Sequence, residues 1–393
     1  MNFKLLFCVV IQILVLSVFI LDFIPMFFIW QSRIKIGRYT DKKVWIKSIE
    51  KKSIQWLKKT PTIKLTDNSR LIFIDMLRGN YKRSTIQSWQ EAALVLGITA
   101  QYTHSNDTSL KKAIDDYVQI KITPFGTWKI PITETDGVIM GYALIQTPWL
   151  DHHHLKPAYD ALWHLMLRLK GKEETVSYKP YTQNYRYVDT IGFICPFLVE
   201  YGQKFKVPEA VDLALIQIEE FNRYALLGDT FIPCHTYTIK SKLPVGLFGW
   251  GRGLGWYAIG LIDAWCVLDA THPKKQKMTL WVEQFARMAI SFQRDNGSWG
   301  WIVMQDNARS DSSTTATLAW FLKNAAAVPT ISKDCQQAVD KAIRYLMTVT
   351  RRDGAIDFSQ GDTKGIGVHS QEFDILPFTQ GFALRTLNHL KYE

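Results

Sequence analysis

The sequence predicts an all-α protein, an (α/α)6 barrel preceded by one N-terminal transmembrane helix. Two observations predict the barrel. Helical segments that are apolar on one side alternate with segments that are apolar on nearly every face, and a helix apolar all round is buried all round. The fully apolar segments also recur at similar intervals, as expected for a degenerate six-fold repeat of helix hairpins. They begin near residues 85, 136, 189, 253, 313 and 378.

The transmembrane helix is predicted from residues 5–30, LLFCVVIQILVLSVFILDFIPMFFIW. This run is longer than the apolar region of a signal peptide, and no small-residue cleavage site follows it. It is long enough to cross a bilayer. Asp22 and Pro25 indicate that its regular part ends near them.

The charges around this run predict its orientation. Lys4 is the only basic side chain before it, whereas five basic residues follow closely, so the positive-inside rule places the rest of the chain in the cytoplasm. The five are Arg33, Lys35, Arg38, Lys42 and Lys43. We therefore expect a single-pass membrane protein with an anchor (1–31), a basic juxtamembrane linker (32–40) and one barrel domain (41–393).

About twelve helical segments follow the anchor, with little strand pattern between them. They lie near 42–59, 85–104, 108–121, 136–147, 153–171, 189–203, 207–225, 253–270, 275–294, 312–327, 334–350 and 378–391. Some are one-sided: Val339, Ile343 and Leu346 recur at helical spacing. Others, such as VIMGYALI at 138–145 and WYAIGLI at 256–262, are apolar throughout. The one-sided segments are expected to surround the apolar ones.

Composition narrows the class of partner. The formal charge is +11, which favours anionic partners, and 13% of the residues are aromatic, which suggests stacking surfaces. Dense Lys/Arg patches with interleaved aromatics are absent from the body of the chain, so nucleic acid is the weakest candidate. The five cysteines form no C-x-x-C pair. Cys195 and Cys266 lie in apolar helical runs, which favours buried free thiols and a reducing compartment.

The starts of the fully apolar helices share polar or glycine-bearing sequence, namely ETDG, YVDT, GRGLG, RSDSS and PFTQG. If these starts converge at one end of the barrel, their side chains line a common bowl. Gly251, Gly253 and Gly255 are then expected to let the backbone turn sharply and approach a ligand. Arg252 and Trp256 are expected to project into the bowl.

Asp136 and Asp189 open two successive apolar helices. Either aspartate can be an N-cap, since Asp is favoured there and accepts from first-turn amides. The alternative is acid/base work, because both lie beside aromatic residues on helices that should share one pocket. A helix N-terminus lowers a carboxyl pKa, so desolvation and a neighbouring carboxylate must outweigh it for a general acid.

The histidines give weaker indications. His235, in FIPCHTYT, fits a ligand contact as well as a satisfied loop histidine. The run His152–His154 starts a one-sided helix and has no Cys or Glu partner at ligand spacing, which indicates a solvated helix start rather than a metal site. We expect no metal and no organic cofactor.

Three motifs together resemble the unsaturated glucuronyl and rhamnogalacturonyl hydrolases, glycoside hydrolase families 88 and 105, which have six-hairpin barrels. They are DGVIM at 136–140, DTIGFICPFL at 189–198 and WGRGLGWY at 250–257. The resemblance covers roughly residues 40–393. It implies that Asp189 is the general acid/base and Asp136 its partner carboxylate. It implies substrate contacts for His235, Arg252 and Trp256, an aromatic place for Tyr187 and a further contact for Trp89.

The resemblance also implies the reaction. Such enzymes remove the 4,5-unsaturated uronic acid that polysaccharide lyases leave at a non-reducing end, by hydration of the C4=C5 bond. The partner is then an anionic oligosaccharide. Leu254 and Thr190 depart from the Asn and Gly common in the family, which leaves the acid in place and bears on specificity. Two alternatives stay open: an inverting glycosidase on saturated glycans, and a non-catalytic, membrane-tethered glycan-binding protein. The sequence indicates no oligomeric state.

Overall fold

A computed structural model describes residues 3–63, 67–68, 70–79 and 87–387. The twelve predicted helices are present, within three residues of each expected bound that lies in the described residues. They are α3 (Lys42–Lys58), α5 (Gln87–Ser105), α6 (Thr108–Lys121), α7 (Val138–Ile145), α8 (Lys156–Leu169), α9 (Val188–Phe205), α10 (Pro208–Tyr224), α11 (Gly251–Val267), α12 (Lys275–Ser291), α13 (Ser312–Ala325), α14 (Ser332–Thr348) and α15 (Pro377–Leu387). Positions 85–86 and 388–391 of the predicted segments lie outside the described residues.

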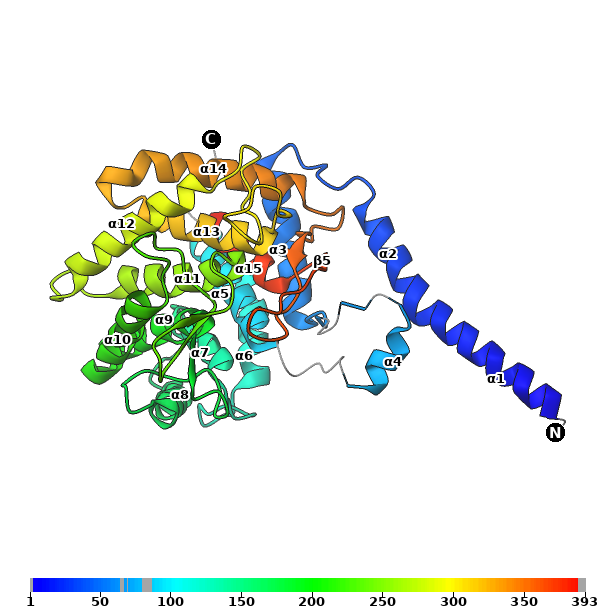
Figure 1. The fold of residues 1–393 in the computed structure, drawn as a ribbon, viewed down its shortest axis with the longest axis horizontal. Coiled ribbons are helices and arrows are strands. Elements are labelled where there is room, and N and C mark those ends of the chain that lie inside the picture. The colour runs from blue at the N-terminus through cyan, green and yellow to red at the C-terminus, as the bar shows by residue number, and fades with distance from the viewer. Residues whose placement is uncertain (1–2, 64–66, 69, 80–86, 388–393) are drawn as a thin grey trace.

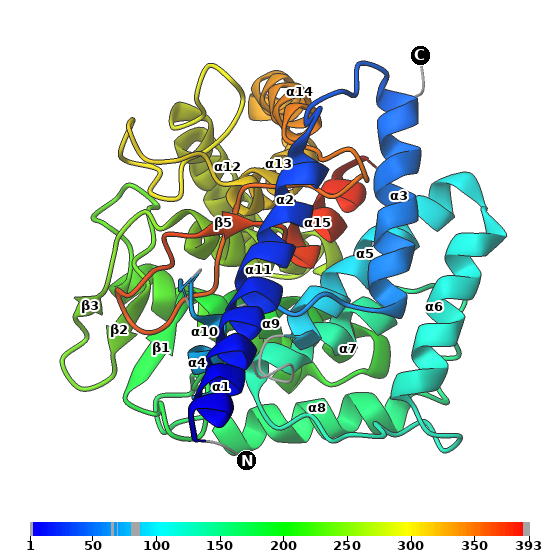
Figure 2. The same ribbon diagram turned by 90° about the vertical axis from the view of Figure 1, so that its right-hand side faces the viewer.

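The helices form two concentric rings, which confirms the predicted (α/α)6 barrel (Figures 1 and 2). The inner ring is α5, α7, α9, α11, α13 and α15, each packed on the next. The outer ring is α3, α6, α8, α10, α12 and α14. The apolar patterns explain the assignment: every residue of α7 is buried, whereas α14 buries one face.

The inner ring closes where α15 packs against α5. The backbones approach so closely that a Cβ on Gly97 would lie 2.4 Å from the Gly381 carbonyl oxygen, and one on Gly381 would lie 2.1 Å from that of Ala93. No side chain fits at either position. The seam between the first and last inner helices therefore depends on these two glycines.

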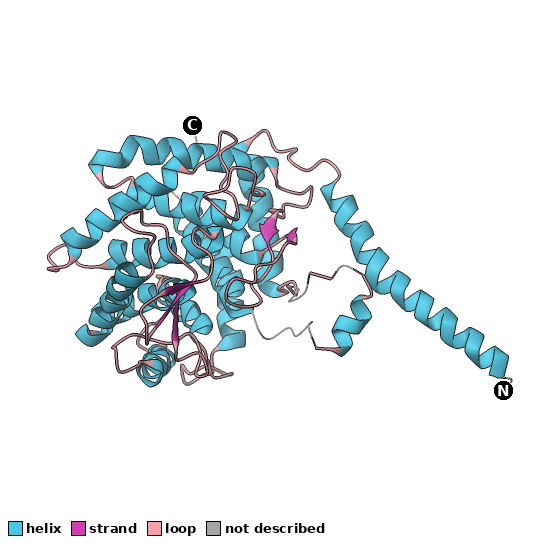
Figure 3. Cartoon of the chain, in the orientation of Figure 1, coloured by secondary structure: helices cyan, strands magenta, loops and turns pink. Residues whose placement is uncertain are grey.

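Short strands sit at the loop ends of the barrel (Figure 3). Strands β1 (Tyr185–Tyr187), β2 (Thr236–Thr238) and β3 (Pro244–Val245) form an antiparallel sheet in that order. Strands β4 (Ser359–Gln360) and β5 (Phe373–Asp374) pair antiparallel. Two single 3-10 turns, η2 (Thr135–Gly137) and η3 (Pro329–Ile331), precede α7 and α14. These elements fix the loops from which the cavity described below is built.

The N-terminal segment is one long helix that extends away from the barrel (Figure 1). It consists of α1 (Phe3–Val18), a π-helical turn η1 (Phe19–Phe23) and α2 (Ile24–Arg33). Within the described residues this is the one helix long and apolar enough to cross a membrane, with mean hydropathy 2.8. Near an N-terminus a signal sequence has the same properties. The expected end near Asp22 and Pro25 is instead the π-helical turn, and the helix continues to Arg33.

Contacts beyond Arg33 join this helix to the barrel. Arg33 donates two hydrogen bonds to Asp357, at 2.6 and 3.0 Å, and one to the Phe373 carbonyl. The amide of Gly37 donates to the Thr350 carbonyl at 2.9 Å. The segment predicted as a linker is therefore packed onto the barrel, beside the β4–β5 pair.

Only one of the two cysteines expected to be buried is buried. Cys195 is enclosed in α9, whereas Cys266 is exposed in the last turn of α11. The apolar run of α11 extends past the part of the helix that its neighbours surround, so periodicity alone gave the wrong environment for Cys266.

Candidate active site

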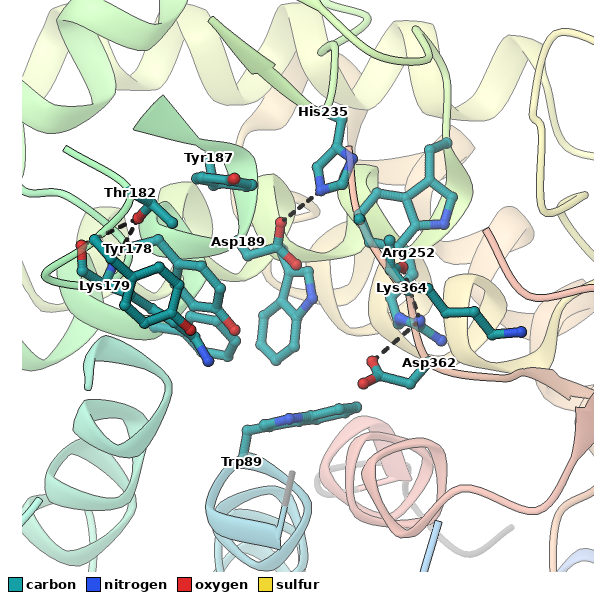
Figure 4. Close-up of a pocket in the computed structure, with 16 residues that line it drawn as sticks. Trp89, Tyr178, Lys179, Thr182, Tyr187, Asp189, His235, Arg252, Asp362 and Lys364 are labelled. Carbon is teal, nitrogen blue, oxygen red and sulfur yellow. Dashed lines mark hydrogen bonds and ion pairs between the residues drawn. The ribbon is translucent and has the colours of Figure 1, made fainter. Parts of the chain in front are cut away.

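A cavity of about 420 Å³ opens at the N-terminal ends of the inner helices (Figure 4). Helices α5, α9 and α11 each contribute residues from their first turns, and loops contribute the rest. The lining residues are Trp89, Tyr178, Lys179, Tyr181, Thr182, Tyr187, Asp189, Phe193, His235, Trp250, Arg252, Trp256, Asp362, Thr363, Lys364 and Gly365. Six of the seven predicted site residues thus share one cavity, as expected from convergent helix starts.

Asp189 is not the N-cap of its helix. The N-cap of α9 is Tyr187, and Asp189 is the second residue of the helix. Its side chain is 16% exposed, and Oδ2 has no hydrogen-bond partner among the described residues. The nearest ionisable neighbour is His235, whose Nε2 lies 3.6 Å from that oxygen. A genuine cap looks different: Asp311 accepts from the Ser313 and Thr314 amides at the start of α13.

Burial raises the pKa of Asp189 to about 7. The positive charge of Arg252 opposes this rise, and the negative charge of Asp362 adds to it. Desolvation therefore outweighs the helix N-terminus, as a general acid requires. A carboxyl with this pKa is protonated in about half of the molecules at neutral pH, so it can give and take a proton there.

His235 is held neutral beside this carboxyl. Its side chain is 4% exposed, and its ring lies against Tyr187 and Trp250 with centroids 5.6 and 4.9 Å apart. Burial lowers its pKa to about 3, with smaller contributions from His369 and Arg252. A neutral imidazole leaves the pKa of Asp189 high and offers a hydrogen-bonding nitrogen to a ligand.

Aromatic rings form the cavity wall. Trp256 packs edge-on against Trp89 with centroids 5.5 Å apart, and against Phe193 at 4.3 Å. Tyr187 lies 5.3 Å from Tyr178, whose ring stacks on Phe193 with centroids 5.9 Å apart (Figure 4). Flat apolar surfaces of this kind suit the faces of sugar rings, and they exclude water from Asp189.

The guanidinium of Arg252 holds a loop. Nη1 donates to the Gln360 carbonyl at 2.5 Å and Nη2 to the Gly361 carbonyl at 2.7 Å. Asp362 lies 3.9 Å away. Arg252 is 2% exposed. It lines the cavity as predicted, but its donors are largely occupied by the segment 360–363.

The glycines around Arg252 have a different role from the predicted one. Gly251, Gly253 and Gly255 lie inside the first turns of α11, not in a sharp turn. A Cβ on Gly251 would lie 2.3 Å from the Thr314 hydroxyl, and one on Gly255 would lie 2.4 Å from that of Thr317. The prediction of a ligand-approaching turn was wrong, because Gly251 and Gly255 let α11 pack closely on α13, whereas Gly253 faces Trp250 and Val188.

Asp136 is the predicted site residue that lies apart. It lines an adjoining cavity of about 610 Å³, together with Glu91, Tyr117 and Glu134. Burial raises its pKa to about 6, and Glu134 adds to the rise, whereas Lys179 opposes it. Burial raises the pKa of Tyr178, which lines the Asp189 cavity, and the charges of both Asp136 and Asp189 add to the rise.

Sequence reasoning missed the loop residues. Asp362 is half-buried beside Arg252, and desolvation raises its pKa. Lys179 pairs with Glu134 at 2.9 Å, and Lys364 reaches the opposite rim. These positions carry no motif. The available signal was length: the connection between α14 and α15 spans residues 349–376, and long connections within compact domains are often functional.

The histidine run at 152–154 precedes α8, and the Nδ1 of His152 lies 3.2 Å from the Tyr159 hydroxyl. Across the described ranges, groups of three or more His, Cys, Asp or Glu side chains arranged to hold a metal ion are absent.

This chain matches one family of known proteins. The family model "Glycosyl Hydrolase Family 88" covers residues 49–385. No curated protein matches the sequence.

Solved structures match the fold at low sequence identity. A possible member of the GH105 family from Salmonella enterica serovar Paratyphi A has TM-score 0.74 and 15% identity, covering 89% of this chain and 94% of its own. The unsaturated glucuronyl hydrolase of Bacillus sp. GL1, responsible for the degradation of glycosaminoglycan, has TM-score 0.62 and 16% identity over 88% and 95%. An unsaturated glucuronyl hydrolase specific for heparin has TM-score 0.64 and 16% identity over 87% and 96%.

Proposed function

Because the chain belongs to glycosyl hydrolase family 88, we propose that it removes a 4,5-unsaturated uronic acid from the non-reducing end of lyase-generated oligosaccharides. The observation that carries the proposal is the Asp189 carboxyl, unpartnered at Oδ2 and raised in pKa to about 7 within an aromatic cavity. The unsaturated uronyl hydrolases among the structural neighbours support the substrate class. Metal and organic cofactors have no role in this proposal.

The first step is protonation of the enol ether. Protonated Asp189 gives its proton to C4 of the unsaturated ring, and positive charge develops at C5 and the ring oxygen. The neutral ring of His235 adds no opposing charge.

The second step is addition of water. The Asp189 carboxylate takes a proton from a water molecule, whose oxygen bonds to C5 and gives a hemiketal. The hemiketal opens with cleavage of the bond to the remaining sugar, which leaves as an alcohol, and a keto-uronate remains. Asp189 ends the cycle protonated, so one carboxyl serves both steps.

Substrate contacts follow from the lining residues. Trp89, Tyr187 and Trp256 supply aromatic surface, and His235 supplies a polar contact beside Asp189. Lys179 and Lys364 on the cavity rim provide positive charge for an acidic sugar. In this proposal Arg252 acts through the loop that it holds, and Asp136 is the partner carboxylate in the adjoining cavity.

The reaction is tested by incubating the protein with lyase-generated fragments of pectin and of glycosaminoglycans. We expect loss of the enol-ether absorbance together with release of the shortened sugar. Release of reducing sugar from saturated glycans with no absorbance change would instead identify an inverting glycosidase. Tight binding without turnover, unchanged in Asp189→Asn, would identify a glycan-binding protein.

The pH dependence of kcat/KM is a direct prediction of the first step. The proton donor must be protonated, and the pKa of Asp189 is raised to about 7. Activity should therefore fall as the pH rises through about 7, where an ordinary aspartate would lose activity near pH 4. Initial rates at low substrate concentration between pH 4 and 9 measure this fall, the descending limb of the pH profile. A descending limb centred near pH 4 would contradict the assignment.

We also propose that the helix Phe3–Arg33 is a retained membrane anchor, with the barrel in the cytoplasm. Two side chains of the helix support retention, because each contacts the rest of the chain. Arg33 pairs with Asp357, and Asp22 accepts from the Leu71 and Ile72 amides. Removal of the helix as a signal peptide would delete both contacts, and Asp357 would keep its ion pair with Arg351.

The orientation is tested by protease accessibility. In intact cells, an external protease should leave the barrel uncut, and disruption of the membrane should expose it. The cluster Arg33, Lys35, Arg38, Lys42 and Lys43 motivates this expectation. Digestion from outside would refute the orientation, and a secreted form that begins after residue 33 would refute the anchor.

A further inference from the structure

A short helix packs against the middle of the N-terminal helix (Figures 1 and 2). It is α4 (Ile72–Leu77), and it is bound through Asp22 in the π-helical turn. The Asp22 carboxylate accepts from the Leu71 amide at 2.6 Å and from the Ile72 amide at 3.0 Å. Asp22 is 4% exposed. The acidic residue within the apolar run is therefore satisfied by α4, which gives its presence a structural reason.

The backbone of Leu71 is strained where its amide contacts Asp22. Leu71 has φ 52°, in the left-handed region that leucine seldom adopts. This conformation directs two consecutive amides at Asp22. Strain of this kind persists where surrounding contacts over-determine it.

Three exposed side chains of this segment are apolar. Leu77 is 83% exposed, Leu71 47% and Met76 45%. Between α4 and the N-terminal helix lies an open groove of about 400 Å³, lined only by apolar side chains, among them Val15 and Phe23 of the helix with Leu71 and Phe73. Contiguous apolar surface of this kind is unfavourable in water and marks a membrane or interaction surface.

Length places α4 at the edge of a bilayer. The helix Phe3–Arg33 has 31 residues, or about 46 Å at 1.5 Å per residue, whereas the hydrocarbon core is about 30 Å thick. The first twenty residues suffice to cross it, which brings Asp22 to the boundary with the headgroups. Arg70 and Arg78, both exposed, flank the apolar residues of α4. Basic residues beside a short apolar face match anionic phospholipid headgroups.

The same segment reaches the cavity. Asp67 accepts from the Ser370 hydroxyl at 2.6 Å and pairs with Lys364 at 3.0 Å. Lys364 lines the cavity. Since four residues of extended chain span at most about 14 Å, Leu71 lies close to the rim. Figure 2 shows α1 and α4 in front of the end of the barrel at which the inner helices begin.

We propose that the segment 70–78 is a second membrane contact, which takes phospholipid acyl chains and headgroups and holds the cavity mouth at the bilayer surface. The glycan then enters the cavity from the membrane surface rather than from bulk solution. This inference rests on the proposed anchor, and it adds a contact that an anchor alone does not require.

The test measures the depth of probes on the full-length protein. Cys8 and Cys266, the two exposed cysteines, are first replaced by serine. Single cysteines are then introduced as Leu77→Cys, Val15→Cys or Leu280→Cys and labelled with an environment-sensitive fluorophore. Leu280 is the matched control, an exposed leucine on α12. The proteins are reconstituted in phosphatidylcholine–phosphatidylglycerol vesicles that contain lipids spin-labelled near the headgroup or deep in the chain.

We expect headgroup-proximal quenching at position 77, quenching by the deep label at position 15 and none at position 280. The quenching at 77 should weaken in Arg70→Gln/Arg78→Gln and in vesicles without phosphatidylglycerol. Unquenched probe at 77 with quenched probe at 15 would overturn the second contact and leave the anchor intact. Unquenched probe at 15 would overturn the anchor, and the inference with it. An unchanged near-UV circular dichroism spectrum verifies that each variant is folded.

Discussion

Replacing Asp189 by asparagine should lower turnover by several orders of magnitude while leaving the protein at least as stable. General acid–base catalysis alone contributes about 10²–10⁴-fold, and here one carboxyl both donates and accepts the proton. Asparagine keeps the shape of the side chain and a hydrogen-bonding oxygen, so the unsaturated oligosaccharide should still bind. Loss of the enol-ether absorbance measures turnover, and calorimetric titration measures binding.

The direction of the expected change in Tm for Asp189→Asn follows from the pKa of Asp189. The pKa of Asp189 is about 7 in the folded protein, above the value of 3.8 usual for an aspartate. A group with a raised carboxyl pKa destabilises the folded state as the pH rises from about 4 to 7, and the cost is complete above 7. The neutral amide removes this cost, so Asp189→Asn should have an equal or higher Tm at pH 8.

Asp311 provides the matched control at the start of the next inner helix but one. It is a fully buried N-cap that accepts from two first-turn amides, and loss of a cap typically costs about 0.5–2 kcal/mol. Asp311→Ala should therefore lower the Tm. If Asp189→Asn behaved in the same way, with turnover almost untouched, Asp189 would be a structural residue and the proposed mechanism would be wrong.

Replacing Arg252 by alanine should loosen the loop 360–363 and shift the pH profile upward. The guanidinium donates to two carbonyls, and hydrogen bonds to charged groups contribute about 1.5–3 kcal/mol each, so the Tm should fall. The positive charge of Arg252 also lowers the pKa of Asp189. Without it, the descending limb of kcat/KM should move above pH 7, and KM should rise because Asp362 and Thr363 are no longer held in place.

Two further variants separate these effects. Arg252→Lys restores the charge but not the bidentate geometry, so the limb should return toward its original position while the Tm stays low. Arg385→Ala removes a buried arginine paired with Asp263 at the opposite end of the barrel. It should lower the Tm and leave the limb unmoved. A limb that does not shift in Arg252→Ala would show that this charge does not act on Asp189.

The fold was largely predictable because the spacing of apolar residues indicates which faces of each helix are buried. The all-apolar VIMGYALI became a fully buried inner helix, and the one-sided 334–350 segment became an outer one. The same signal could not give the environment of Cys266, since hydropathy does not say where a helix leaves the ring. Nor could it separate a glycine that turns the chain from one that admits a neighbouring helix, as at Gly251 and Gly255.

The site was predictable where residues lie at helix starts and not where they lie in loops. Asp189, Arg252 and Trp256 stand in motifs at the ends of inner helices, and these ends converge. Asp362 comes from a loop more than a hundred residues further along the chain, and its approach to Arg252 depends on the β4–β5 pairing. Asp136 sits at a helix start as well, but it lines an adjoining cavity rather than that of Asp189, which one-dimensional spacing does not reveal.

The seam at Gly97 and Gly381 has a consequence for biosynthesis. Helix α5 begins at residue 87 and its partner α15 at residue 377, so 290 residues must be translated between them. At about 5–20 residues per second this takes about 15–60 s. During that interval the nascent chain gains its other inner helices one by one, and the face of α5 that will pack against α15 stays uncovered. The ring therefore cannot close before α15 is made, and a chain released before that point is an open barrel with an exposed apolar edge.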